Sequence, residues 1–119
     1  MIAVNASTGE FAWRVRLGVT DDLPEGKKNT GRYNLGGPIV TAGGLVFVGA
    51  TNDHRFRAFD SKTGRELWVT RLDYSASSVP MTFLGKDGKQ YVAIAEGGGI
   101  AIGGGDDNNN ESLIVFALQ

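Results

Sequence analysis

Two stretches of the sequence decide the fold, because they repeat one pattern at a constant spacing. The first runs Ala3-Val4-Asn5-Ala6-Ser7-Thr8-Gly9-Glu10-Phe11-Ala12-Trp13, and the second runs Ala58-Phe59-Asp60-Ser61-Lys62-Thr63-Gly64-Arg65-Glu66-Leu67-Trp68. Both read A-x-[N/D]-x-x-T-G-x-x-x-W, and they lie 55 residues apart. Self-similarity at a fixed offset is the sequence signature of a repeat architecture.

Each part of the repeated motif has a physical role in a strand-turn-strand unit. The asparagine or aspartate ends a strand, and its side chain accepts hydrogen bonds from backbone amides two residues on. Gly9 and Gly64 supply the positive φ that a tight turn needs. Trp13 and Trp68 stand in the following strand, where each offers a large flat surface to bury against a neighbouring sheet. The motif therefore predicts structural anchors at these four positions.

Nine segments are rich in strand-forming residues and are bounded by glycine or polar clusters. They are residues 1–5, 10–17, 38–42, 45–50, 55–60, 65–72, 78–84, 90–95 and 112–118. Two of them contain runs that are apolar without alternation, at 45–50 and 91–95, which indicates burial on both faces. Sheets stacked face to face bury strands in this way, as the blades of a β-propeller do. The predicted fold is all-β, with antiparallel four-stranded blades.

Counting strands along the chain predicts about two blades and one extra outer strand, in a single partial β-propeller domain covering residues 1–119. In this interpretation residues 1–60 form the outer strand and the first blade, residues 61–119 form the second blade, and the Thr-Gly turns connect one blade to the next. Short turns should gather on one face and long loops on the other, and function usually resides on such loops.

Composition excludes several classes of protein. Net charge is −1 and no basic run occurs, so a nucleic-acid partner is not expected. No stretch of 18 apolar residues is present, so we expect no transmembrane segment. The chain has no cysteine, which excludes disulfides and thiolate metal sites. The first residues lack the basic and apolar regions of a signal peptide, and we expect them to lie within a strand.

The repeated motif resembles the tryptophan docking motif of eight-bladed quinoprotein dehydrogenases, which depend on pyrroloquinoline quinone (PQQ). Residues 34–47 and 49–53 are similar to the C-terminal region of the membrane-bound glucose dehydrogenase branch. The resemblance implies a periplasmic or membrane-associated parent protein, in which a central funnel holds PQQ and calcium. It also implies oxidation of a small alcohol or sugar at the quinone.

The chain departs from this family at informative positions. Gly97-Gly98-Gly99 stands where the glucose-oxidising branch has Gly-Gly-His. The calcium ligands, the quinone-stacking tryptophan and the catalytic aspartate of the family belong to earlier blades. We therefore expect a C-terminal fragment of a PQQ-dependent alcohol or sugar dehydrogenase that binds no cofactor and is inactive alone. The alternative is a non-enzymatic scaffold or protein-interaction module built from PQQ-type repeats.

Three residues, Asn34, Asn52 and Asp53, are candidates for cofactor binding, and the resemblance places Asp53 near the active-site funnel. Asp53 is also the one candidate for a catalytic role, orienting a substrate hydroxyl or supporting a base; the alternative is an aspartate that caps a turn. His54 is the single histidine, which excludes a His-rich metal site, and we expect it to be exposed on a loop.

The glycine- and asparagine-rich run at 97–110 offers the oxygen ligands that calcium prefers. It lacks the alternating ligand spacing of an EF-hand, so we expect a surface loop and no metal site. Isolated blades leave apolar faces exposed. The expected partners are therefore the remaining blades of the propeller, or further copies of this chain that associate through blade faces.

Overall fold

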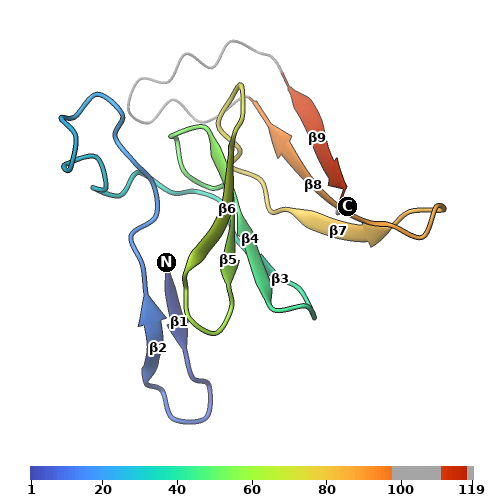
Figure 1. Cartoon of the computed structure of the whole chain (residues 1–119), viewed down its shortest axis with the longest axis horizontal. Coiled ribbons are helices and arrows are strands. Elements are labelled where there is room, and N and C mark those ends of the chain that lie inside the picture. Colours follow the sequence, from blue (N-terminus) through green and yellow to red (C-terminus); the bar gives the residue numbers. More distant parts are fainter. Residues whose placement is uncertain (98–110, 118–119) are drawn as a thin grey trace.

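The computed structural model describes residues 1–97 and 111–117, and within them the chain is all-β, as predicted (Figure 1). The described residues contain nine strands. Each lies inside one of the nine predicted segments or extends past it by no more than one residue. They are β1 (Ile2–Val4), β2 (Phe11–Arg14), β3 (Ile39–Val40), β4 (Leu45–Val48), β5 (Arg55–Asp60), β6 (Glu66–Arg71), β7 (Met81–Leu84), β8 (Gln90–Glu96) and β9 (Ser112–Ala117). The predicted surface loop lies mostly outside the described residues.

The strands form three antiparallel sheets that fan out side by side (Figure 1). The first contains β1 and β2, the second has the order β3-β4-β5-β6, and the third has the order β7-β8-β9. The two repeats adopt one register: Ala3 pairs with Trp13 and Ala58 pairs with Trp68, and in both hairpins the register shifts directly after the alanine. The sequence repeat is therefore a structural repeat.

The Thr-Gly turns do not connect one sheet to the next, and this part of the prediction is wrong. β6 is hydrogen-bonded to β5, so the turn at residues 61–65 closes a hairpin inside the second sheet. The blade boundary placed after residue 60 moves accordingly, to the connection that follows β6. The described chain thus contains a two-stranded sheet, a four-stranded sheet and a three-stranded sheet. Its assignment to a single domain stays a prediction.

The turn residues act as their chemistry predicts. The Asp60 carboxylate accepts hydrogen bonds from the amides of Lys62 and Thr63, at 3.0 and 2.8 Å. Gly64 follows with φ at 70°. The hydroxyl and amide of Thr63 lower the pKa of Asp60 below its ordinary value, because they stabilise the charged carboxylate. The same turn, with Gly9 at φ 76°, closes the β1–β2 hairpin.

The two inner strands of the second sheet, β4 and β5, are buried on both faces. Val46 and Val48 of β4 join a cluster facing the first sheet, whereas Phe47 of the same strand joins a cluster facing the third. In β5, Phe56 is fully buried and contacts the third sheet through Phe116, with ring centroids 5.6 Å apart. The prediction that the apolar strand at 45–50 is covered from both sides is confirmed.

Short and long connections separate to opposite ends of the sheets, as predicted (Figure 1). We call the end with the long connections the loop face; within the described residues these connections are residues 15–38, 49–54 and 72–80. The hairpin turns of the first two sheets lie at the lower end of the view, the β7–β8 turn lies at its right, and the long connections lie at its upper end. The loop face therefore collects the irregular, polar segments of adjoining sheets.

Candidate functional site

The loop at residues 49–54, between β4 and β5, is the centre of the loop face. Ala50 and His54 have φ values of 62° and 55°, a region that residues other than glycine seldom adopt. The Ala50 amide donates to the Ala76 carbonyl at 2.7 Å, and the Ala50 carbonyl accepts from the Leu35 amide at 3.1 Å. The two neighbouring long connections thus hold this loop from both sides and offset the cost of its backbone conformation.

A close approach of backbones makes this arrangement possible. A Cβ atom at Gly49 would lie 2.8 Å from the Ala76 carbonyl oxygen and 2.7 Å from Ile94 Cδ1. At Gly36 it would lie 3.0 Å from Ala50 Cα. Glycine at both positions therefore lets the three loop segments pack against one another.

Asp53 is buried and fully engaged by neighbouring groups. Arg57 donates to it through both terminal guanidinium nitrogens, Nη1 and Nη2. Thr51 Oγ1 donates to it at 2.6 Å, and the Val19 amide donates at 2.9 Å. Burial alone would raise the pKa of Asp53, but the hydrogen bonds from Arg57 and Thr51 outweigh it, so its pKa lies below the ordinary value. A carboxylate of this kind is a poor general base.

A second ion-pair cluster lies beside the first and is more open to solvent. Asp21 accepts hydrogen bonds from Arg55 Nη2 and Arg71 Nη2, each at 2.9 Å. The hydrogen bond from Arg55, followed by that from Arg71, lowers the pKa of Asp21 against the opposing effect of desolvation. Arg55 also lies 3.7 Å from Asp53, so the two clusters are continuous.

Sequence reasoning missed these arginines, although the sequence carries a signal for them. Arg55 and Arg57 are two residues apart on one strand, so they project from the same face of the sheet. Arg57 lies in an otherwise apolar stretch, and a buried charge requires a partner. Arg57 is 3% exposed and pairs with Asp53 and, at 3.2 Å, with Glu66.

A polar cavity of about 200 Å³ opens at these clusters on the loop face. Its lining combines carboxylates, guanidinium groups and an amide: Val19, Asp21, Asp22, Arg32, Asn52, Asp53, His54 and Arg71. Arg32 Nε donates to Asn52 Oδ1 at 3.0 Å, which fixes the orientation of both side chains. The cavity can therefore offer hydrogen bonds and charges of either sign to a small polar ligand.

Two of the predicted site residues meet at this cavity. Asn52 and Asp53 line it, whereas Asn34 is exposed and forms an isolated β-bridge with Thr51 without lining it. His54, expected to be exposed, is half-buried, and its Nδ1 lies 3.0 Å from the Asp73 carbonyl oxygen. The structure thus brings the predicted residues to one face and gives Asp53 an ion-pairing environment.

The two tryptophans of the repeat have different surroundings. Trp13 Nε1 donates to the Ser61 carbonyl at 2.9 Å, which links the first sheet to the second. Its ring lies over the turn, because a Cβ atom at Gly64 would be 2.6 Å from Trp13 Cε3. Trp68 instead packs edge-on against Phe56 and Phe116, with ring centroids 5.9 and 5.2 Å away.

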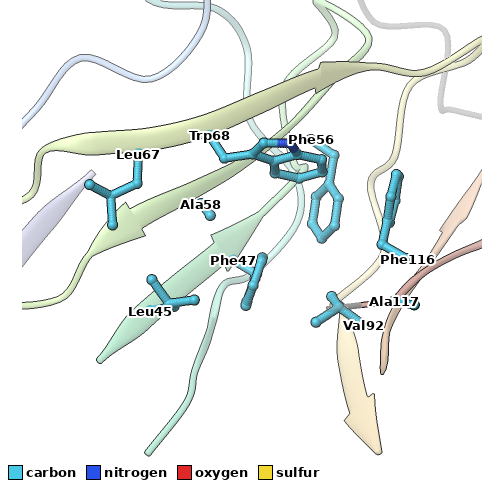
Figure 2. A pocket seen from close by; sticks show the side chains of 9 residues that line it. All are labelled: Leu45, Phe47, Phe56, Ala58, Leu67, Trp68, Val92, Phe116 and Ala117. Atoms are coloured by element: carbon cyan, nitrogen blue, oxygen red, sulfur yellow. The ribbon is translucent and has the colours of Figure 1, made fainter. Parts of the chain in front are cut away.

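Trp68 borders an apolar groove of about 440 Å³ between the second and third sheets. Figure 2 shows its lining side chains: Leu45, Phe47, Phe56, Ala58, Leu67, Trp68, Val92, Phe116 and Ala117. Trp68 remains 39% exposed. Neither tryptophan lines the polar cavity, so neither supplies a flat surface for a ligand bound there.

The donor set of the described residues does not fit a calcium ion. Calcium takes six to eight oxygen ligands, several from free carboxylates. Here Asp53 and Asp21 are bound by arginines, and no group of three or more metal-ligating side chains occurs in residues 1–97 and 111–117. A planar quinone would also need a flat apolar surface, which the polar cavity lacks.

None of the described segments forms a helix long and apolar enough to cross a membrane.

Comparison with known proteins gives consistent matches. The family model described as glucose/ethanol/alcohol dehydrogenase, beta-propeller domain, matches residues 1–92. Quinate/shikimate dehydrogenase (quinone) of Acinetobacter baylyi is 43% identical over 82% of this chain and 13% of its own length. Quinoprotein glucose dehydrogenase A of Acinetobacter calcoaceticus is 38% identical over 97% of this chain and 14% of its own.

Solved structures agree with the sequence matches. A europium-containing methanol dehydrogenase superposes with a TM-score of 0.63 and 38% identity, covering 81% of this chain and 14% of that protein. The chain thus spans about one seventh or less of the length of the relatives that it matches.

Proposed function

Because the chain belongs to the β-propeller family of the PQQ-dependent glucose, ethanol and alcohol dehydrogenases, we propose that it acts as one sector of a quinoprotein dehydrogenase propeller. The observation that carries the proposal is the sheet arrangement. A four-stranded sheet stands between a two-stranded and a three-stranded one, and the long connections at residues 15–38, 49–54 and 72–80 lie at one end of the sheets. In the assembled propeller this loop face borders the substrate funnel.

The chemistry of the proposed parent protein is the oxidation of an alcohol group. Bound PQQ supplies the two-electron acceptor for this reaction. Residues outside this chain hold the PQQ and its metal ion, since Asp53 and Asp21 are already paired with arginines and the described residues contain no cluster of three metal-ligating side chains. This chain supplies part of the funnel wall, and alone it is inactive. The parent protein acts in the periplasm or at the membrane.

The two repeat tryptophans act as docking anchors between blades. Support comes from Trp13, which bonds to the Ser61 carbonyl of the next sheet and covers the glycine of its turn. Trp68 occupies the same motif position, and its groove faces the third sheet. An indole at such a joint combines a large buried area with one directional hydrogen bond.

A chimera tests this function. The aligned segment of the Acinetobacter baylyi quinate/shikimate dehydrogenase is replaced by this chain, and PQQ-dependent reduction of an artificial electron acceptor is measured with quinate. We expect turnover that disappears when PQQ is withheld. A chimera that folds, as judged by circular dichroism and size, but shows neither PQQ binding nor turnover would favour a scaffold role. The isolated chain with PQQ, calcium and glucose or ethanol serves as the control, and turnover there would contradict the placement of the cofactor ligands.

A further inference from the structure

The polar cavity on the loop face has the features of a binding site for a small organic anion. Its volume of about 200 Å³ suits a ligand smaller than a typical drug. Arg32 and Arg71 both line it, and each is held by another side chain. Asn52 holds Arg32 through Nε, and Asp21 holds Arg71 through Nη2. Two guanidinium groups are thus fixed at the rim before any ligand arrives.

The charges around the cavity leave one guanidinium charge in excess at Asp21, which two arginines share, and leave Arg32 without a carboxylate partner among the described residues. Asp53 is bound by Arg57, and Asp21 is shared between Arg55 and Arg71. Within residues 1–97 and 111–117, Arg32 makes its single hydrogen bond through Nε, which leaves its two terminal nitrogens to donate elsewhere. A planar guanidinium with two free donors on one edge binds carboxylate in a bidentate manner.

The remaining lining groups suit hydroxyl groups. Asp22 is exposed and lines the cavity, as does Asn52, whose Oδ1 accepts from Arg32 and whose amide nitrogen is a further donor. A carboxylate accepts from an alcohol hydroxyl, and an amide nitrogen donates to it. Within one small volume, the cavity thus offers guanidinium groups that can bind an anion, and a carboxylate and an amide that can bind hydroxyl groups.

We propose that this cavity binds a small polyhydroxylated carboxylic acid, with Arg32 and Arg71 on its carboxylate and with Asp22 and Asn52 on its hydroxyls. This proposal rests on the proposed function and gives it a substrate class. A hydroxy acid carries both the anionic group that the arginines bind and the alcohol group that a dehydrogenase of this family oxidises.

Binding to the full 119-residue chain tests the site. Sodium quinate is titrated while the backbone amide signals of Val19 and Asn52 are followed by NMR. We expect saturable shifts at both, and at least ~10-fold weaker binding of methyl quinate, which lacks the charge. The Arg32→Gln variant should weaken quinate binding by a similar factor. The control is Arg65→Gln, the same change at an exposed arginine in the turn at the opposite end, and it should leave binding unchanged.

Several results would overturn the proposal. These are no shift with quinate, equal binding of the methyl ester, or equal weakening by both substitutions. The chimera gives a second measurement: Arg32→Gln should raise the KM for quinate about 10-fold or more. Quinate turnover with an unchanged KM would refute the cavity assignment and leave the proposed function standing. Arg32-dependent binding of quinate in an inactive chimera would refute the function and leave the cavity standing.

Discussion

Substituting Gly64 by alanine tests the contact between the first two sheets, and Gly9 provides a matched control. Both glycines close the same turn at nearly the same φ, 70° and 76°. A Cβ atom at Gly64 would lie 2.6 Å from Trp13 Cε3, whereas one at Gly9 would meet nothing within 4 Å. The two substitutions therefore share the backbone cost and differ in the contact with the indole ring.

The magnitudes follow from these distances. The left-handed conformation costs an alanine about 1–2 kcal/mol at either site. At Gly64 the added methyl group also displaces the Trp13 ring, which costs about 1–3 kcal/mol by overpacking. Displacing the ring strains the hydrogen bond from Trp13 Nε1 to the Ser61 carbonyl, which contributes about 1 kcal/mol. Gly64→Ala should thus lower the free energy of unfolding by about 2–6 kcal/mol, depending on how far the hydrogen bond is weakened, and Gly9→Ala by about 1–2 kcal/mol.

Urea unfolding followed by far-ultraviolet circular dichroism measures both losses. The excess at Gly64 should disappear when Trp13 is replaced by alanine, because the methyl group then occupies the space left by the ring. A double-mutant cycle on Trp13 and Gly64 reports this coupling directly. Equal losses for the two glycine variants, or no coupling, would refute the inter-sheet contact.

Three further predictions follow from the loop face. Asp53→Asn should lower the free energy of unfolding by about 3 kcal/mol, because it leaves the buried Arg57 charge with a weaker set of partners; urea unfolding measures this. The folded pKa of Asp53 lies below its ordinary value of 3.8, so its stabilisation is present above that pH and is lost as the pH falls through the folded pKa. Thermal midpoints should therefore fall steeply below about pH 4, and Asp53→Asn should reduce that slope. Gly49→Ala places a Cβ 2.8 Å from the Ala76 carbonyl oxygen and should lower the free energy of unfolding by about 1–3 kcal/mol. Gly43→Ala is its control, because the nearest atom to the added Cβ would be 3.9 Å away. In urea unfolding the control should lose less than half as much stability.

The positions of the strands could be predicted from the sequence because their signals are local. Apolar runs such as residues 45–50 and turn residues such as Gly64 act on their immediate neighbours. The both-sided burial of β4 also followed from its lack of alternation. Strand and turn positions depend on few long-range contacts, whereas the burial of β4 depends on neighbouring sheets and could be predicted because its apolar composition requires cover on both faces.

The grouping of strands into sheets was wrong because the turn was interpreted as a link between blades. The five residues between β5 and β6 have the length of a hairpin loop. A link between sheets must cross from an edge strand of one sheet to an edge strand of the next. The longer segment at residues 72–80 does this, since it joins β6 to β7. Loop length was the signal that favoured the observed arrangement.

The chemistry of Asp53 could not be predicted from its position in the sequence. Its partner Arg57 lies four residues on, beyond the point where the loop becomes a strand, and Val19 comes from a distant connection. Such a constellation depends on how three loops fold together. Strand counting placed the loop that carries Asp53 on the loop face, whereas the ion-pairing environment of Asp53 required the structure, and its place beside a funnel stays a prediction.

Light scattering on the purified 119-residue chain tests the central claim, that these sheets need neighbouring blades to cover their faces. Apolar residues on the outer strands remain uncovered, including Leu84 at 74% and Leu113 at 64% exposed. We predict a mass that rises with concentration well above the 12.6 kDa of a single chain. A monodisperse 12.6 kDa species that persists at high concentration and unfolds cooperatively would contradict the account.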